Sequence, residues 1–112
     1  MSRRLPPLYA LRAFEAASRH HSFTRAAEEL SITQSAISRH IRTLEDYFAC
    51  RLFQRSGRTL QLTESARLLL PGGREGFAAL QRACHTLNAE DDILRMKAPS
   101  TLTMRWLRAR LR

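Results

Sequence analysis

Five polar side chains between positions 34 and 42 have the chemistry needed to contact base edges or phosphate groups. They are Gln34, Ser35, Ser38, Arg39 and Arg42. The amide and hydroxyl groups are short and permit close approach to a surface, whereas guanidinium groups bind guanine or phosphate through two parallel hydrogen bonds. A face needed only for solubility usually carries Glu and Lys. We therefore interpret these residues as a nucleic-acid-binding face, and a merely solvated helix face is the alternative.

The five residues fall on a predicted helix whose opposite face is apolar. Its apolar residues recur at intervals of four, three and four positions, and they are Ile37, Ile41, Leu44 and Phe48. This spacing is typical of an amphipathic helix. Thr33 is the predicted N-cap, because its hydroxyl can accept a hydrogen bond from an unpaired backbone N–H group of the first turn.

Two further helices are predicted before this one. The first follows Pro6 and Pro7, which suit a helix N-terminus, and its apolar stripe comprises Leu8, Leu11, Phe14 and Ala17. The second covers residues 23–30, with Ser22 as its N-cap and Thr24 as a second candidate. The turn between the second and third helices is tight, although Gly would fit it more easily than Ser31 does.

A basic hairpin is predicted after the third helix. The segments "RLFQRS" and "TLQLT" flank "SGR", which reads as two short strands joined by a tight turn. Arg55 and Arg58 lie near its tip, where they can reach a phosphate backbone. Three helices followed by such a hairpin predict a mainly α fold, a winged helix-turn-helix, in which the third helix enters the major groove and the hairpin wing touches flanking DNA.

The charge of the chain is strongly positive and unevenly distributed. Nineteen Lys and Arg residues stand against ten Asp and Glu residues, and eighteen of the nineteen are Arg. The net charge is +5 over residues 1–62, −2 over residues 63–92 and +6 over residues 93–112. An Arg excess predicts a polyanionic partner, with nucleic acid first and an anionic membrane surface second. The net-negative middle segment is suited to a partner other than a polyanion.

This middle segment is predicted to be a long helical region that begins after Thr63. Pro71, Gly72 and Gly73 interrupt it, so a kink or two separate helices are expected. Beyond them the apolar residues follow an a/d spacing for two heptads, namely Phe77, Leu80, Cys84 and Leu87. A seam this short must pack on a second copy or, alternatively, on its own domain. Residues 93–97 alternate in polarity and predict a strand.

Nothing in the sequence favours an enzyme. Cys50 and Cys84 are expected to be reduced thiols, since no export signal precedes them. No Cys or His pair has the spacing of a zinc site. No nucleophile–base pair or phosphate-binding loop is apparent, so we expect no catalytic residues, metal or cofactor. No apolar run is long enough to cross a membrane.

The sequence also resembles the LysR-type transcriptional regulators of bacteria. The resemblance rests on "SFTRAAEEL", "TQSAISRHIRTLE", Leu52-Phe53 with Arg55, and Leu62-Thr63, in order and at the family's spacing, and it covers about residues 5–90. The N-terminal part is similar to the subgroup that includes regulators of glycine cleavage and of β-lactamase. Three positions depart from the family pattern, since Ala49 and Ala66 replace Gly and Arg51 replaces Pro.

The resemblance implies a homodimer that binds double-stranded DNA in the bacterial cytoplasm, at the nucleoid. It implies DNA contacts at the helix and wing residues Thr24, Arg25, Thr33, Gln34, Ser35, Ser38, Arg39, Arg42, Arg55 and Arg58. The Phe77–Leu87 seam would pair the linker helices. Family members sense a small-molecule effector in a further domain.

The expected organisation is a DNA-binding domain at residues 1–63, a linker and dimerisation helix at residues 64–92, and the incomplete start of an effector-binding domain at residues 93–112. We therefore expect a fragment of a regulator, through an engineered truncation or an early end of the reading frame. The alternative function is a dimerisation or interaction fragment that lacks effector sensing. A membrane-surface role for residues 100–112 is a weaker possibility.

Overall fold

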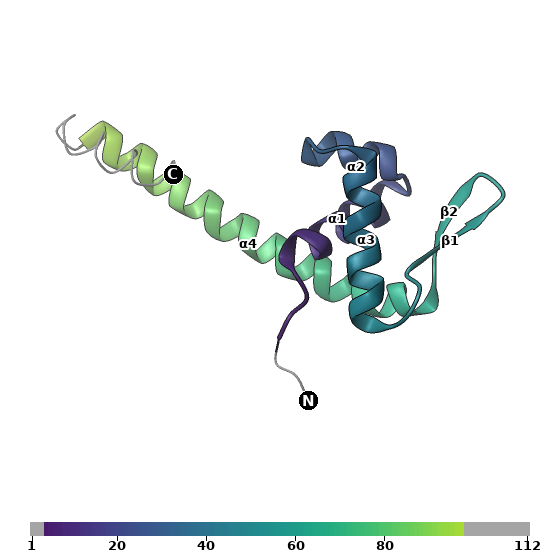
Figure 1. The fold of residues 1–112 in the computed structure, drawn as a ribbon. Helices are drawn as coiled ribbons and strands as arrows, with labels where there is room; N and C mark the ends of the chain where they lie inside the picture. Colours follow the sequence, from purple (N-terminus) through teal and green to yellow (C-terminus); the bar gives the residue numbers. More distant parts are fainter. Residues whose placement is uncertain (1–3, 98–112) are drawn as a thin grey trace. The chain divides into compact units, whose positions relative to one another are not determined.

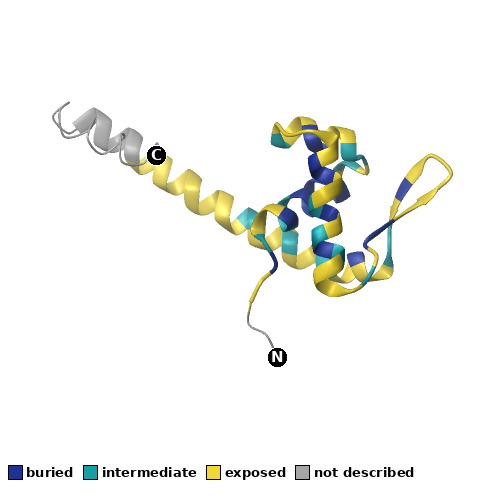
Figure 2. Cartoon of the chain, in the orientation of Figure 1, coloured by how far each residue is buried: buried dark blue, intermediate teal, exposed yellow. Residues whose placement is uncertain are grey.

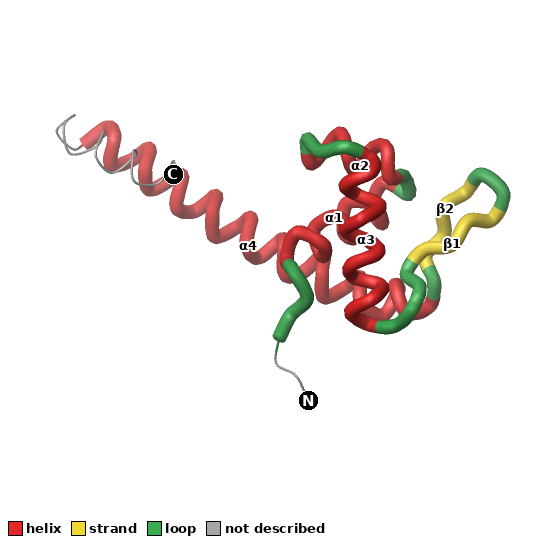
Figure 3. Tube along the Cα trace, viewed as in Figure 1, coloured by secondary structure: helices red, strands yellow, loops and turns green. Residues whose placement is uncertain are grey.

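The computed structural model describes residues 4–97, with residues 91–97 described only as part of a helix. The described chain contains α1 (Leu8–His20), α2 (Phe23–Leu30), α3 (Gln34–Phe48), β1 (Phe53–Ser56), β2 (Thr59–Leu62) and α4 (Glu64–Lys97) (Figure 1). β1 and β2 form an antiparallel two-stranded sheet (Figure 3). The predicted winged helix-turn-helix, followed by a long helix, is confirmed. Residues up to 77 and residues from 78 onward form two units and are described separately.

Two of the three N-terminal helices begin at the predicted caps. The Ser22 hydroxyl accepts a hydrogen bond from the backbone N–H of Arg25 at 3.1 Å, and the Thr33 hydroxyl accepts one from Ala36 at 3.0 Å. Each bond satisfies a backbone donor that the helix itself leaves unpaired. Thr24, the second candidate for the cap of α2, instead lies inside its first turn.

All three N-terminal helices end at a non-glycine residue in the left-handed conformation. These residues are His21, Ser31 and Ala49, with φ angles of 51°, 57° and 53°. The conformation lets the chain turn while the backbone N–H groups that follow α2 and α3 bond back to helix carbonyls. The expectation that Gly would suit positions 31 and 49 is therefore confirmed, because a side chain costs about 1 kcal/mol there.

The hydrophobic core lies where α1 packs against α2 and α3 (Figure 2). It is built from small residues on α1 and larger ones around them, namely Ala10, Ala13, Phe14, Ala16, Ala17, Ala26, Ala27, Ile37, Ile41, Leu44, Leu52, Phe53, Leu60, Ala66 and Leu70. The four fully buried alanines of α1 let the neighbouring helices approach closely.

Two predicted core positions are wrong. Leu8 is 55 % exposed and Phe48 is 40 % exposed, whereas Ala10 and Ala13 of α1 are fully buried. Helical periodicity predicts that an apolar face exists but not which small residues extend it. The buried face of α1 is therefore centred on its alanines and Phe14.

α4 continues through Pro71 as one helix. Of the two predicted alternatives, two separate helices are therefore wrong, and the kink stays a prediction. Pro71 and Gly72 are exposed, and there is open space beside Gly72 and Gly73. Pro71 removes one backbone hydrogen bond and Gly72 and Gly73 have low helix propensities, but the helix continues across all three residues. The strand predicted at residues 93–97 is also wrong, since α4 extends to Lys97. Its alternation was too short to distinguish strand from helix. Residues 98–112 lie outside the described chain.

Candidate nucleic-acid interface

The predicted recognition residues lie on the exposed surface of the N-terminal half of α3. Gln34, Ser35, Ser38, Arg39 and Arg42 are all exposed. The opposite face of the helix is buried, and it comprises Ala36, Ile37, Ile41 and Leu44. The sequence pattern therefore placed these side chains on one accessible face, while their contact with DNA stays a prediction.

The first turns of α2 and α3 meet at this face through two polar side chains. The Thr24 hydroxyl donates a hydrogen bond to the amide oxygen of Gln34 at 3.1 Å. The amide nitrogen of Gln34 is thereby left as the end that can donate to a ligand. Arg25, the next residue of α2, is exposed. Thr33 is exposed as well, but its hydroxyl is already engaged as the cap of α3.

The wing carries its two arginines on exposed positions. Arg55 of β1 is paired in register with Leu60 of β2, which points its side chain into the core. Gly57 and Arg58 form the loop between the strands, and Gly57 has a φ of 64°. A glycine in the first position of a two-residue loop is typical of a tight hairpin. The predicted basic tip is therefore present.

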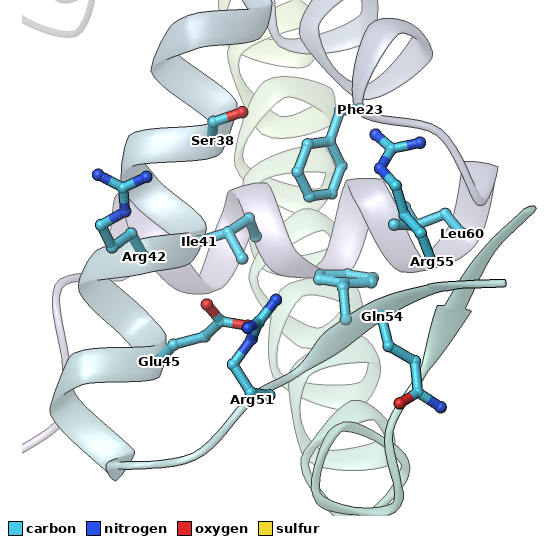
Figure 4. A pocket seen from close by; sticks show the side chains of 10 residues that line it. Phe23, Ser38, Ile41, Arg42, Glu45, Arg51, Gln54, Arg55 and Leu60 are labelled. Atoms are coloured by element: carbon cyan, nitrogen blue, oxygen red, sulfur yellow. The ribbon is translucent and has the colours of Figure 1, made fainter. Parts of the chain in front are cut away.

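A groove of about 380 Å³ separates α3 from the wing (Figure 4). Its apolar lining comes from Phe23, Ile41, Phe53 and Leu60, and its polar lining from Ser38, Arg42, Glu45, Arg51, Gln54 and Arg55. The structure thus brings Ser38 and Arg42, predicted from the helix pattern, together with Arg55, predicted from the hairpin. Three guanidinium groups and a single carboxylate line this groove.

Sequence reasoning missed Glu45 and Arg51 as residues of this site. The Glu45 carboxylate accepts a hydrogen bond from the backbone N–H of Leu52 at 2.8 Å, and one of its oxygens lies 3.5 Å from Nε of Arg51. Figure 4 shows the two side chains directed toward one another. The available signal was Arg51 itself, a charged residue where the family pattern has Pro.

A cluster of charged side chains joins α1 to α2 away from the groove lining. The Arg19 guanidinium contacts Glu15 at 2.9 Å and Glu29 at 2.8 Å, and His20 Nε2 lies 2.6 Å from Glu29. The hydrogen bond from Arg19 is the main cause that lowers the pKa of Glu29 to about 2. The same two carboxylates raise the pKa of Arg19. This cluster holds the second helix in place against the first.

The predicted seam on α4 falls into two environments. Phe77 is half-buried, and the Arg12 guanidinium lies over its ring at 5.5 Å, within residues 1–77. In the unit that follows, Leu80, Cys84 and Leu87 are exposed. The ring of Phe77 therefore packs on its own domain, whereas the other three residues present apolar surface.

The part of the chain that the structure describes also contains side chains of metal-ligating types, thiols and apolar groups. No cluster of His, Cys, Asp or Glu there could hold a metal ion. Cys50 and Cys84 are free thiols. None of the described helices is long and apolar enough to cross a membrane.

A family model of bacterial regulatory helix-turn-helix proteins of the lysR family matches residues 8–67, which include α1, α2, α3 and the wing. The chain belongs to this family. The resemblance noted from the sequence motifs is therefore confirmed. The matched segment contains every predicted DNA-binding residue of this LysR-family chain, but the match does not test their individual roles.

The relatives of this LysR-family chain include regulators of the two kinds that its N-terminal part resembles. It is 45 % identical over 113 residues to the glycine cleavage system transcriptional activator of Escherichia coli K12, covering 99 % of this chain and 37 % of that protein. It is 40 % identical over 107 residues to the carbapenem-hydrolyzing beta-lactamase transcriptional activator of Serratia marcescens, covering 94 % of this chain and 37 % of that protein. The chain thus spans little more than a third of the length of such relatives.

Solved structures of LysR-family proteins share the fold. The oxidized form of Corynebacterium glutamicum OxyR superposes with a TM-score of 0.69 at 28 % identity, covering 77 % of this chain and 28 % of that one. A BenM DNA-binding domain in complex with catB site 1 DNA gives a TM-score of 0.66 at 26 % identity, covering 74 % of this chain and 93 % of that one. The second similarity spans nearly all of a domain crystallised on DNA.

Proposed function

We propose that this chain is the DNA-binding part of a LysR-type transcription regulator, which binds double-stranded DNA sequence-specifically as a homodimer. The observation that carries the proposal is the exposed face of α3 beside a basic wing, in a fold shared with a domain crystallised on DNA. An α-helix fits the major groove, and the wing then lies over the neighbouring backbone.

The residues divide into two roles according to their length and charge. Gln34, Ser35 and Ser38 are short hydrogen-bonding groups that read base edges, and Arg39 reads guanine or holds a phosphate. The remaining predicted contacts fix the position of the protein on the backbone, and they are Thr24, Arg25, Thr33, Arg42, Arg55 and Arg58. Phosphate contacts make the affinity strongly dependent on salt.

A dimer follows from the exposed apolar seam on α4. Leu80 and Leu87 are 53 % and 41 % exposed in the single chain, and Cys84 lies between them. Pairing of two such helices, with Phe77 at the edge of the seam, would bury this surface and place two copies of α3 on an imperfect inverted repeat. Effector sensing would belong to a full-length relative, and the site of action is the bacterial chromosome in the cytoplasm.

Selection of bound duplexes from a random DNA pool tests the proposal without a known target. The expected result is enrichment of related half-sites in inverted orientation at a fixed spacing. The matched control is Arg39→Glu, which reverses a charge on the exposed face and leaves the buried face of α3 intact. Recovery of unrelated sequences by both proteins would show that the chain does not bind DNA sequence-specifically.

The second candidate is a dimerisation fragment that pairs with full-length regulators and does not bind DNA productively. The exposed seam at Leu80 and Leu87 favours it. Leu80→Asp should convert the dimer to a monomer in sedimentation, with Arg82→Asp as a control on the same helix. A Leu80→Asp protein that remains dimeric excludes this seam from the interface. A wild-type dimer without selective DNA binding would favour the second candidate.

A further inference from the structure

We propose that Arg51 is an additional DNA-phosphate-binding residue of the groove between α3 and the wing, and that Glu45 restrains it when DNA is absent. This inference rests on the proposed function. The occupant is a phosphodiester of the DNA backbone that crosses the groove beside the face of α3. Arg51 belongs to neither the recognition helix nor the hairpin tip, where the sequence predicted the contacts.

The charges around the groove favour an anionic occupant. Arg42 from α3, Arg51 from the loop before β1 and Arg55 from β1 line it, and Glu45 is the single acidic residue of the lining. Figure 4 shows Arg51 and Glu45 at one side of the groove and Arg55 at the opposite side. The floor beneath them is apolar, and a low-dielectric wall concentrates the field of nearby charges.

Glu45 makes two contacts, one of which is structural and the other electrostatic. Its hydrogen bond with the backbone N–H of Leu52, at 2.8 Å, holds the carboxylate against the loop. Its contact with Nε of Arg51 is longer, at 3.5 Å, and the Arg51 side chain is 79 % exposed. Such an exposed pair is weak. Arg51 can therefore exchange Glu45 for a phosphate, which guanidinium binds through two hydrogen bonds.

The loop that carries Arg51 is held by its backbone. The carbonyl of Arg51 accepts a hydrogen bond from the Thr63 hydroxyl at 2.6 Å, and Leu52 beside it is almost fully buried. Neither contact uses the Arg51 side chain. Because these contacts run through the backbone and through Leu52, the side chain of Arg51 can be replaced without disturbing the fold.

Salt-dependent binding of Arg51→Ala to a duplex selected by the wild type tests the first half of the proposal. Loss of one phosphate contact in each subunit of the dimer lowers the salt slope by about 1.8, so that raising salt from 50 to 200 mM costs the variant about twelvefold less affinity than the wild type. Preference among duplexes should stay the same. Arg51→Lys should retain the slope, and Arg74→Ala controls for loss of an arginine outside the groove lining.

Glu45→Gln tests the restraint. The amide oxygen can still accept the bond from Leu52, while the negative charge is removed, so DNA binding should tighten about two- to fivefold. In a protein that also carries Arg51→Ala, Glu45→Gln should increase DNA affinity by a smaller factor. Circular dichroism tests whether each variant is folded. If Arg51→Ala is unfolded, Arg51→Gln is used in its place.

The outcomes separate this inference from the function on which it rests. Wild-type protein without salt-dependent binding to any duplex would overturn the proposed function. If the wild type binds DNA but folded Arg51→Ala has the same salt slope as the wild type, only the role of Arg51 is overturned. Unchanged or weaker DNA binding by folded Glu45→Gln would overturn the role of Glu45.

Discussion

The Thr24 hydroxyl donates a hydrogen bond to the amide oxygen of Gln34 at 3.1 Å, so a residue of α2 orients the first side chain of α3. Ten positions separate the two residues in the sequence. The bond leaves the amide nitrogen of Gln34 as a donor on the exposed face. If Gln34 reads a base, Thr24 acts through it as a positioning residue.

Thr24→Val should therefore weaken selectivity at one base pair while leaving the salt slope unchanged. Removal of Gln34 itself, in Gln34→Ala, should cost about 1–3 kcal/mol of discrimination at that base pair, and Thr24→Val should cost a fraction of this. Thr24→Ser keeps the hydroxyl and should behave as the wild type. The measurement is the relative affinity for a selected duplex and its single-base variants. Equal selectivity in all four proteins would remove both residues from base reading.

Arg58→Ala should weaken binding to all sequences by the same factor. Arg58 is exposed at the wing loop, where a guanidinium can neutralise a phosphate but cannot distinguish bases. The salt slope should fall by about 1.8, because the dimer loses one phosphate contact in each subunit. Titration at several salt concentrations measures it, with Arg74→Ala as the control. A slope equal to that of the wild type would exclude Arg58 from the contacts.

Ala49 and Ala66 should respond to substitution by Gly in opposite directions. Ala49 has a φ of 53°, so Ala49→Gly should raise the free energy of unfolding by about 1 kcal/mol. Ala66 is fully buried inside α4, so Ala66→Gly should lower it by about 1 kcal/mol. Urea unfolding measures both. Stabilisation by Ala66→Gly, or destabilisation by Ala49→Gly, would contradict this account.

Acid should weaken the contact between α1 and α2 through Glu29. Its pKa in the folded protein is about 2, below the ordinary value of 4.5, because Arg19 donates hydrogen bonds to the carboxylate. A lowered folded-state pKa contributes stability that is fully present above pH 4.5 and is lost as the pH falls toward 2. The stability difference between wild type and Glu29→Gln should therefore shrink across this range. Glu28→Gln, at the neighbouring exposed position, is the control.

The sequence by itself determined the elements whose signals are local. The caps at Ser22 and Thr33 act within three residues, and the apolar spacing of α3 repeats within the helix. Ile37, Ile41 and Leu44 could therefore be assigned to the core, and Gln34, Ser38 and Arg39 to the surface. The need for a left-handed residue at positions 31 and 49 was equally local, since a backbone turn requires it.

Tertiary structure decided what depends on residues far apart in the chain. Burial of Ala10 rather than Leu8 follows from how α1 meets its neighbours, which no periodicity within α1 specifies. α4 passes through the exposed Pro71, although the local Pro and Gly residues predicted an interruption there. The groove joins Arg42, Arg51 and Arg55 only because the loop after α3 returns the wing to its side. Local patterns specify helices and strands, whereas their mutual packing brings separate side chains into one site.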